Sequence, residues 1–371
     1  MRSAALLLIG AVVIQLPSSS RPRARELGIA PGVMEAGRLN AITDVDGVRV
    51  GHTTIVEGNN VRTGVTAILA HGGNLFRDKV PGAVFVGNAF GKLAGSTQVE
   101  ELGTIESPIV LTNTLSVGVA IDAVVRWTLA QPGNENVRSL NALVGETNDG
   151  TLNDIRGLHV TREHVISAIS GAKSGPVQEG AVGAGTGTIA FGWKGGIGTS
   201  SRRVRQQNEM WTVGVLVQTN YGGRLTIDGV PVWKTLSPRP GLPAGALAEA
   251  GSCMIVVATD APLDARDLKR LAARAIFGLA RTGSTYSNGS GDFAIAFSTH
   301  SAVRITATNG PQPRTILPTD SISPLFEAAL DATEEAVYNS LLQATDTTGN
   351  GQTIRALPIG QLKELFAKSR Q

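Results

Sequence analysis

The sequence predicts a single α+β domain in which strands and helices form separate layers. Three observations favour this class. Strand-like runs are grouped with strand-like runs, helical segments are grouped with helical segments, and no internal repeat is present. Of the 371 residues, 42% are hydrophobic and 17% charged, so the chain can bury a sizeable core and disorder is excluded as its main state. Because aromatic residues make up only 4% and glycines number 45, we expect an aliphatic core with many tight turns.

The first half of the chain contains four short predicted strands and two predicted helices. Short β-type runs broken by glycine occupy residues 48–52, 65–70, 83–86 and 109–111. A helix is predicted over residues 120–130, because Ala120, Ala123 and Trp127 fall on one stripe, and a shorter helix over 161–171. The glycine-rich residues 180–198 lack the G-K-[ST] sequence of a phosphate-binding loop, so we expect glycine-bent strands there.

The second half opens with an apolar strand over 211–218 and an exposed connector, rich in proline and glycine, over 231–246. A buried strand follows over 253–259. Asp264 is a suitable N-cap for the next helix and Gly283 can end it. Further elements are predicted at the end of the chain: strands over 293–298 and 303–308, a helix over 324–342 and a short final helix.

Composition excludes several classes of partner and cofactor. With Lys+Arg 33 against Asp+Glu 30, the net charge of +3 predicts no nucleic-acid partner, and the cluster at 202–205 is expected to be a solvated loop. No stretch reaches about 18 consecutive apolar residues, so no membrane segment is expected. Cys253 is the single cysteine, and the five histidines show no H-E-x-x-H spacing. We therefore expect neither a disulfide nor a metal or organic cofactor.

The N-terminus resembles an export signal. Arg2 precedes a mostly apolar run over residues 4–16, too short to span a bilayer but suited to a signal-peptide core, and Pro17 and three serines follow. We expect a signal peptide over 1–20, a loose lead-in over 21–40 and one domain over 41–371, in a periplasmic or secreted protein. A buried N-terminal helix or a misassigned start is the alternative.

Gly251-Ser252 is the strongest candidate for chemistry, because it follows the connector and opens a buried strand. If the peptide bond before Ser252 were cut, the serine would carry a hydroxyl and a free α-amine. Such an amine has a pKa near ~8, so it can act as a general base for its own hydroxyl. Glycine has no Cβ and allows a strained geometry beside the hydroxyl. Taken alone, a Gly-Ser pair is also an ordinary turn.

Five segments of the chain together resemble a known family. They lie in one order along the sequence: GKLAGSTQVEELGTIESPIVLTNTLSVG (91–118), GETNDGTLND (145–154), QTNYG (218–222), AEAGSCMIVVATDAPL (248–263) and YSNGSGDFAIAFST (286–299). They are similar to the L-aminopeptidase D-esterase/D-amidase family, which includes the β-peptidyl aminopeptidases. The resemblance runs from about Gly47 to at least Thr299.

This resemblance implies a fold and a maturation step. The fold is a four-layer α/β/β/α sandwich, similar to the N-terminal nucleophile hydrolases but with different connectivity. The chain is made as an inactive precursor that cleaves itself between Gly251 and Ser252. The products are an α chain ending at residue 251 and a β chain of residues 252–371. The two stay together as a heterodimer, and heterodimers assemble into homo-oligomers.

The resemblance also assigns catalytic roles. Ser252 would be the nucleophile, and Ser290 would contact its amine and share in proton transfer. Asp292 would orient this network, at a position where a glutamate is also known. Asn220 would donate its amide to the oxyanion. A turn residue is the plainer reading of Asn220, and a turn cap after Gly291 that of Asp292.

Two further residues are implied near the substrate. Glu146 would pair with the substrate ammonium. Asn148 lies where relatives often carry a tyrosine; its amide can donate a hydrogen bond but cannot act as an acid. The acidic loop around it, which contains Asp149, suggests a cation site but lacks the EF-hand spacing. Cys253 should point to the opposite face of the strand from Ser252, as a small core residue.

The leading hypothesis is an exported, self-processing serine aminopeptidase or amidase. It releases N-terminal residues from short peptides, amides or esters through an acyl-enzyme on Ser252. The signal-like N-terminus favours the branch that cleaves β-peptides. One alternative is acyl transfer of the ornithine acetyltransferase type, in which a threonine occupies the processed position. Another is a non-catalytic periplasmic binding protein that remains one intact chain.

Overall fold

The computed structural model describes residues 21–238, 251–306 and 310–369, and the structural statements below concern these ranges. The predicted signal peptide over 1–20 and part of the predicted connector over 231–246 lie outside the described residues.

Two sheets form the centre of the molecule. The first has five strands in the order β1-β2-β6-β7-β4, with bounds β1 (Arg49–Glu57), β2 (Val61–Leu69), β6 (Ile109–Asn113), β7 (Leu143–Thr147) and β4 (Leu93–Ala94). The second has seven strands, in the order β10-β11-β12-β13-β3-β14 with β5 also paired to β3. Its bounds are β10 (Ile197–Gln206), β11 (Glu209–Asn220), β12 (Gly251–Thr259), β13 (Ser290–Ser298), β3 (Asp78–Ala89), β14 (Ile305–Thr306) and β5 (Thr104–Ile105).

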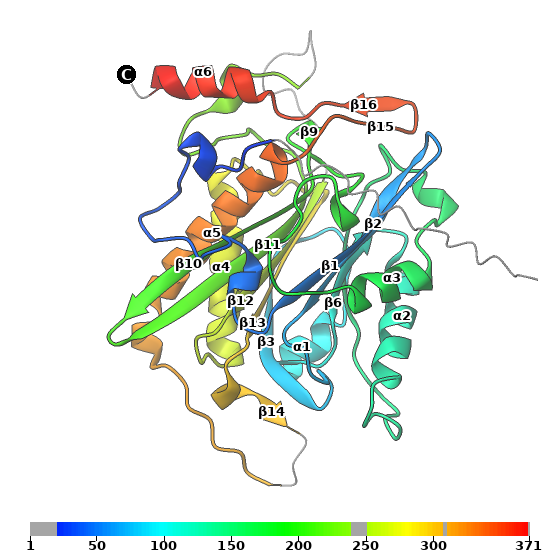
Figure 1. The fold of residues 1–371 in the computed structure, drawn as a ribbon, viewed down its shortest axis with the longest axis vertical. Helices are drawn as coiled ribbons and strands as arrows, with labels where there is room; N and C mark the ends of the chain where they lie inside the picture. Colours follow the sequence, from blue (N-terminus) through cyan, green and yellow to red (C-terminus); the bar gives the residue numbers. More distant parts are fainter. Residues whose placement is uncertain (1–20, 239–250, 307–309, 370–371) are drawn as a thin grey trace, which may run out of the picture.

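Helices cover the outer face of each sheet. Figure 1 shows two helices beside the five-stranded sheet, α2 (Val117–Leu129) and α3 (Arg162–Ser170), and two beside the seven-stranded sheet, α4 (Ala265–Arg281) and α5 (Ser323–Leu342). The layers therefore run helix, sheet, sheet, helix. The expected α+β four-layer sandwich is confirmed.

Two crossovers set the strand order that builds the site. Strands β6 and β7 run parallel and are joined through α2, and β12 and β13 run parallel and are joined through α4. Parallel neighbours need such a connection, because a short turn cannot bring the chain back to the same end of the sheet. As a result, the C-terminal end of β11 and the N-terminal ends of β12 and β13 lie side by side at one end of the seven-stranded sheet.

Side-chain alternation along β12 separates two cores. Met254 and Val256 belong to the apolar cluster between the two sheets, whereas Cys253 and Ile255 belong to the cluster beneath α4 and α5. This alternation follows from the two-residue period of a strand. Ser252 therefore shares its face with Met254 and points toward the five-stranded sheet.

The two predicted ends of helix α4 are confirmed. The side chain of Asp264 accepts a hydrogen bond from the amide of Asp267 at 2.9 Å and caps α4, and Gly283 adopts a left-handed φ of 97° just beyond its end. The predicted strand over 303–308 is wrong in part. Ser301–Val303 forms a 3-10 turn, β14 covers only Ile305–Thr306, and residues 307–308 lie outside the described residues.

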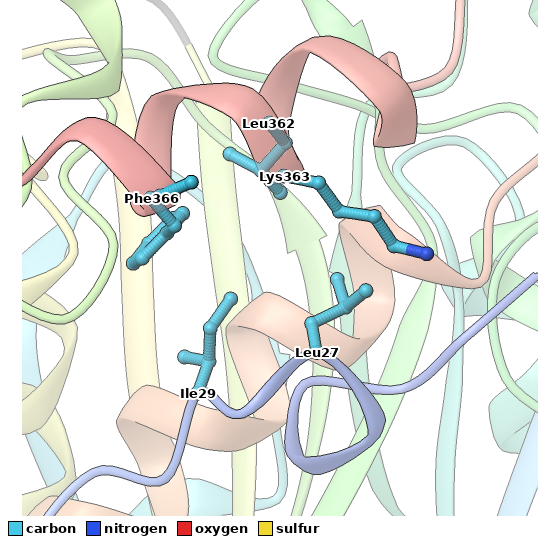
Figure 2. A pocket seen from close by; sticks show the side chains of 6 residues that line it. Leu27, Ile29, Leu362, Lys363 and Phe366 are labelled. Atoms are coloured by element: carbon cyan, nitrogen blue, oxygen red, sulfur yellow. The ribbon is translucent and has the colours of Figure 1, made fainter. Parts of the chain in front are cut away.

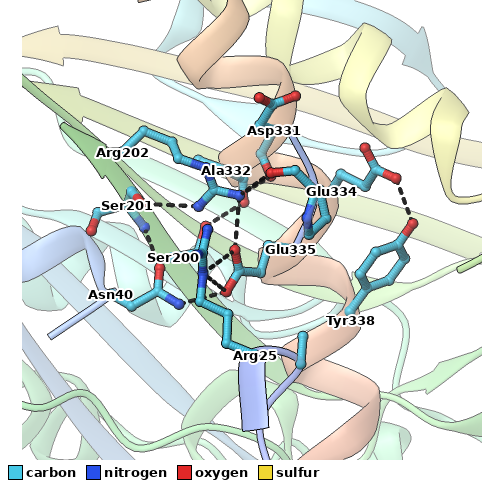
Figure 3. A network of polar contacts seen from close by, with 12 residues as sticks. Arg25, Asn40, Ser200, Ser201, Arg202, Asp331, Ala332, Glu334, Glu335 and Tyr338 are labelled. Carbon is cyan, nitrogen blue, oxygen red and sulfur yellow. Dashed lines mark hydrogen bonds and ion pairs between the residues drawn. The ribbon is translucent and has the colours of Figure 1, made fainter. Parts of the chain in front are cut away.

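The solvated loop expected around Arg202 is wrong. Arg202 lies in β10, is fully buried, and places its Nη2 atom 2.8 Å from a carboxylate oxygen of the equally buried Glu335 on α5. Figure 3 shows this pair at the centre of a polar network between β10 and α5. A buried arginine is tolerated only with such a partner, and the partner lies far away in sequence.

Residues 21–40 also differ from the loose lead-in that was expected. Arg25 pairs with Glu335 at 3.1 Å, and the amide of Asn40 donates to the same carboxylate at 2.5 Å (Figure 3). Leu27 and Ile29 face the C-terminal helix α6 (Ile359–Ser369) across an apolar pocket of about 180 Å³ (Figure 2). The segment is thus tied to both α5 and α6.

Several short elements had no clear sequence signal. These are α1 (Ser96–Leu102), β15 (Thr347–Gly349) and β16 (Gln352–Ile354). The strands expected in the glycine-rich residues 180–198 are present as the short pair β8 (Ile189–Ala190) and β9 (Trp193–Lys194). In the parts of the chain that the structure describes, none of the helices combines the length and apolar character needed to cross a bilayer.

Candidate active site

Ser252 lies second in β12, between two neighbouring strands that carry other predicted site residues. It is paired in register with Asn220 of β11 on one side and with Gly291 of β13 on the other. Its side chain is 7% exposed, and its Oγ atom accepts a hydrogen bond from the amide of Gly291 at 3.2 Å. The hydroxyl is therefore buried and held in place by the backbone of β13.

Gly251 has no room for a side chain. A Cβ atom built there would lie 2.2 Å from the carbonyl oxygen of Asn220 and 2.3 Å from the Cα atom of Tyr221. Both are backbone atoms, so they cannot move aside as a side chain can. The glycine is required by the close approach of β11, and this approach brings the Gly251–Ser252 peptide bond against Asn220.

Ser290 and Asp292 flank Gly291 and lie buried beside the Gly251–Ser252 bond. In register, Ser290 pairs with Gly251 and Asp292 with Cys253. The Oγ atom of Ser290 and both carboxylate oxygens of Asp292 are buried without a hydrogen-bond partner among the described residues. Burial raises the pKa of Asp292 to about 6; the Ser290 hydroxyl and the Cys253 amide lie close enough to oppose this in part, but neither is in hydrogen-bond geometry with the carboxylate. These unpaired oxygens form a site suited to a cation or a cluster of N–H donors.

Asn220 ends β11 with its side-chain amide already oriented. Its Oδ1 atom accepts a hydrogen bond from the amide of Ile189 at 3.0 Å, and the residue is 8% exposed. With the oxygen engaged on that side, the Nδ2 group must face the other way as a donor. Since Asn220 is paired in register with Ser252, this donor lies on the strand position beside the serine. The structure places Asn220 in a strand and not in a turn.

Glu146 reaches the same region from β7 of the facing sheet. Its carboxylate accepts hydrogen bonds from the hydroxyl of Thr114 and from the amide of Lys92, the latter at 2.9 Å, and the ammonium of Lys92 lies 3.7 Å from Oε1. A Cβ atom at Gly91 would lie 3.2 Å from Oε1 and 3.5 Å from the Cα atom of Gly291. Gly91 therefore lies between the buried carboxylate of Glu146 and Gly291, the residue whose amide donates to Ser252 Oγ.

Asn148 is not brought into contact with these residues. Its side chain is exposed, and its Oδ1 atom accepts a hydrogen bond from the amide of Gly150 at 2.9 Å, which closes an Asx turn. The neighbouring Asp149 is buried and bonded to Asn153 at 3.0 Å, and burial raises the pKa of its carboxyl to about 6. Over the described residues, no group of three or more His, Cys, Asp or Glu side chains is placed to hold a metal ion.

Cys253 points away from the site, as expected. It is fully buried in the core beneath α4 and α5, and burial raises the pKa of its thiol well above the usual value. A buried thiol that holds its proton is a poor nucleophile. The hydroxyl of Ser252 lies on the other face of β12, between the two sheets.

Four contributors to the site were missed from sequence. Lys92 and Thr114, which donate hydrogen bonds to Glu146, both lie inside segment 91–118 of the family resemblance. The motif includes these residues, but nothing in it indicates that they contact Glu146. The amides of Ile189 and Gly291 act through the backbone, and a backbone donor leaves no residue-type signal.

Comparisons with known proteins agree on one family. The model of peptidase family S58 matches residues 40–354. A β-peptidyl aminopeptidase, BapA of Sphingosinicella microcystinivorans, is 43% identical over 99% of this chain and 96% of its own length. A Burkholderia sp. β-aminopeptidase structure has a TM-score of 0.86 at 40% identity, covering 94% of this chain and 99% of that one. The L-aminopeptidase D-Ala-esterase/amidase of Ochrobactrum anthropi, described as a variant of the Ntn hydrolase fold, has a TM-score of 0.87 at 38% identity with the same coverage.

Proposed function

Since the chain belongs to peptidase family S58, we propose that it is a self-processing serine aminopeptidase that uses Ser252 as its nucleophile. The family membership confirms the resemblance seen in the sequence motifs. Aminopeptidase activity follows from the family. The cleavage, the nucleophile and the roles of individual residues are the further content of the proposal, and they rest on the geometry at the start of β12.

Self-cleavage begins at the Gly251–Ser252 peptide bond. The Oγ atom of Ser252 attacks the carbonyl carbon of Gly251, and the C–N bond breaks as the nitrogen of Ser252 takes up the hydroxyl proton. The resulting ester is hydrolysed by water, which leaves a carboxylate on Gly251 and both a free amine and a free hydroxyl on Ser252. Water is the only co-reactant that this sequence of steps needs.

The observation that carries the proposal is the set of unpaired oxygens beside this bond. Ser290 Oγ and the two carboxylate oxygens of Asp292 are buried without partners in the uncut chain, and burial of unpaired polar groups costs free energy. Cleavage creates a new α-amino group on Ser252, which pairs in register with the intervening Gly291. The amino group supplies the donors that these oxygens lack, so the uncut site is already arranged to receive it.

Substrate hydrolysis then uses the same groups. The carboxylate of Glu146 binds the ammonium of the substrate N-terminus, and the neutral α-amine of Ser252 removes the proton of its own hydroxyl as Oγ attacks the scissile carbonyl. The Nδ2 group of Asn220 donates to the oxyanion. A donor of this kind contributes about 10²–10³ in rate in well-studied hydrolases. Water hydrolyses the acyl-enzyme and regenerates Ser252.

The two fragments are expected to remain associated, because the seven-stranded sheet interleaves them. Strands β12 and β13 of the C-terminal fragment lie between β11 and β3 of the N-terminal fragment and pair with both. Separation would break two strand interfaces and leave one edge of each of these four strands unpaired. We further propose that heterodimers assemble into homo-oligomers and that the protein is exported, as the segment over 1–20 indicates.

We also propose that the substrates include peptides with an N-terminal β-amino residue. Two of the relatives described above carry that activity in their names, at 43% and 40% identity. Matched amides with an α- or a β-amino residue, otherwise identical, separate the two preferences by their kcat/KM values. An acceptor amine added to the same assay distinguishes hydrolysis from acyl transfer.

Ser252→Ala is the direct test, with Ser96→Ala as its matched control because Ser96 also follows a glycine. We expect Ser252→Ala to give one uncut chain without amidase activity and Ser96→Ala to behave like the wild type. Hydrolysis of amides by folded Ser252→Ala at a wild-type rate would remove Ser252 from the mechanism. A wild-type protein that binds these amides without turnover would indicate a binding protein.

A further inference from the structure

A fully buried lysine lies in the glycine-rich segment that the proposed mechanism does not use. Lys194 ends the hairpin β8–β9, and its side chain is 0% exposed. Its Nζ atom donates to three backbone carbonyls, those of Gly185 at 2.9 Å, Thr188 at 2.9 Å and Gly195 at 2.7 Å. Only the protonated amine has three protons to give, so this set of acceptors suits the ammonium form.

Burying an ammonium group is costly, which makes a purely space-filling role a poor explanation. Burial lowers the pKa of Lys194 to about 7, and the nearby carboxylate of Asp149 acts in the opposite direction. An apolar residue of similar length would avoid that cost. A lysine at this position therefore calls for an effect that depends on its charge or on its N–H groups.

The carbonyl of Thr188 connects Lys194 to the site. This carbonyl and the amide N–H of Ile189 belong to one planar peptide unit, and that N–H donates to Oδ1 of Asn220 at 3.0 Å. A cation at the carbonyl draws electron density along the peptide unit and makes its N–H a stronger donor. The polarisation passes through the Asn220 amide to its Nδ2 group, because hydrogen bonds in a chain strengthen one another.

The hairpin does not need Lys194 to keep its backbone in place. The amide of Gly195 donates to the carbonyl of Thr188 at 3.1 Å, and the amide of Phe191 donates to the carbonyl of Tyr221 at 2.7 Å. These backbone hydrogen bonds already join the two strands of the hairpin and fix it to the end of β11. What Lys194 adds is polarisation and orientation of the 188–189 peptide unit.

We propose that Lys194 is a positioning residue that orients and polarises Asn220 through the Thr188–Ile189 peptide unit and so strengthens oxyanion binding. This inference rests on the proposed role of Asn220 as the oxyanion donor. Since Lys194 does not approach Ser252 directly, its effect belongs to the chemical step and to self-cleavage, and not to recognition of the substrate ammonium.

A double-mutant cycle tests the inference, with Lys194→Met, Asn220→Ala and the combined variant. Rates are expressed per processed chain, with the processed fraction taken from intact mass, and the first-order rate of self-cleavage is followed as a second readout. We expect Lys194→Met to lower kcat about tenfold with KM nearly unchanged, a change of about 1.4 kcal/mol in the barrier. In the Asn220→Ala background the same substitution should change kcat by less than about twofold.

Two further variants keep the result interpretable. Lys194→Gln retains two N–H donors without the charge, so it serves if the methionine variant fails to fold; it should lower kcat less than methionine does and show the same coupling to Asn220. Lys79→Met removes a different lysine, which lies near the start of β3 and is ion-paired with Glu106, and should leave kcat unchanged.

The outcomes separate the two levels of the proposal. Equal effects of the Lys194 substitutions with and without Asn220, or no effect on kcat, would overturn the role assigned to Lys194. If Asn220→Ala itself leaves kcat unchanged, the oxyanion role of Asn220 fails, whatever the Lys194 variants do.

Discussion

Replacing Gly251 with alanine should slow self-cleavage about 10²-fold by steric means alone. The added Cβ atom would lie 2.2 Å from the Asn220 carbonyl oxygen and 2.3 Å from Tyr221 Cα, whereas non-bonded contacts are stable near ~3.5 Å. The backbone of β11 or β12 must therefore move by roughly 1 Å. Overpacking of this kind costs about 1–3 kcal/mol. A displacement of this size at the reacting atoms can slow a positioned reaction about 10²-fold.

The assay is the appearance of two fragments over time, followed by denaturing electrophoresis and intact mass. Gly118→Ala is the control, because a Cβ atom at that position in α2 meets nothing within 4 Å; it should process normally and be slightly more stable, since alanine favours a helix. Cleavage of Gly251→Ala at the wild-type rate would refute the reasoning, because it would mean that β11 does not hold the bond in the geometry described.

Three further outcomes are expected. Lys92→Met should lower KM for substrates with a free amine about threefold at constant kcat, because the Lys92 ammonium, 3.7 Å from Glu146, competes for the same carboxylate. Glu335→Gln should lower the free energy of unfolding by about 3–5 kcal/mol in chemical denaturation, because it leaves the buried Arg202 uncompensated. Asp292 should contribute a loss of roughly 2 kcal/mol to the stability of the uncut precursor as the pH rises from 4 to 7, because burial raises its pKa to about 6 and the folded state then holds the proton more tightly than the unfolded state.

Each of these outcomes has its own control. A rise in KM for Lys92→Met would indicate that the lysine binds the substrate's carboxyl end instead. Glu100→Gln, in the exposed pair with Lys269, should cost less than about 1 kcal/mol, and an equal loss in both variants would contradict the special cost of the buried pair. Asp292→Asn, measured as melting temperature against pH in the uncut Ser252→Ala chain, should remove the Asp292 part of the slope; an unchanged slope would assign it to other carboxyls.

Local signals predicted the second half of the fold well. The apolar run before Thr259 and the Asp264 cap were sufficient to identify β12 and α4, because burial and capping act over a few residues. Arg202 shows where such signals fail. Its charge indicated an exposed loop, and nothing near it in sequence announces Glu335, which reaches it only through the packing of α5 on β10.

The site divides in the same way. Motifs placed Ser252, Asn220 and Glu146, and the structure brings all three to the facing surfaces of two sheets. Asn148 was assigned to the site only because it lies in the same motif as Glu146, and in the structure its side chain accepts a hydrogen bond from the amide of Gly150 within a turn. The hydrogen bonds made by the Ile189 amide and by Lys194 depend on how the glycine-rich hairpin packs against β11. No residue pattern in the sequence predicts that packing.

Intact-mass analysis combined with N-terminal sequencing of the active wild-type protein tests the proposed maturation most directly. We expect two fragments, one ending at Gly251 and one beginning with Ser252, in equal amounts and eluting together under native conditions. A single chain that hydrolyses amide substrates at full rate without a new terminus at Ser252 would contradict the proposed nucleophile and its general base.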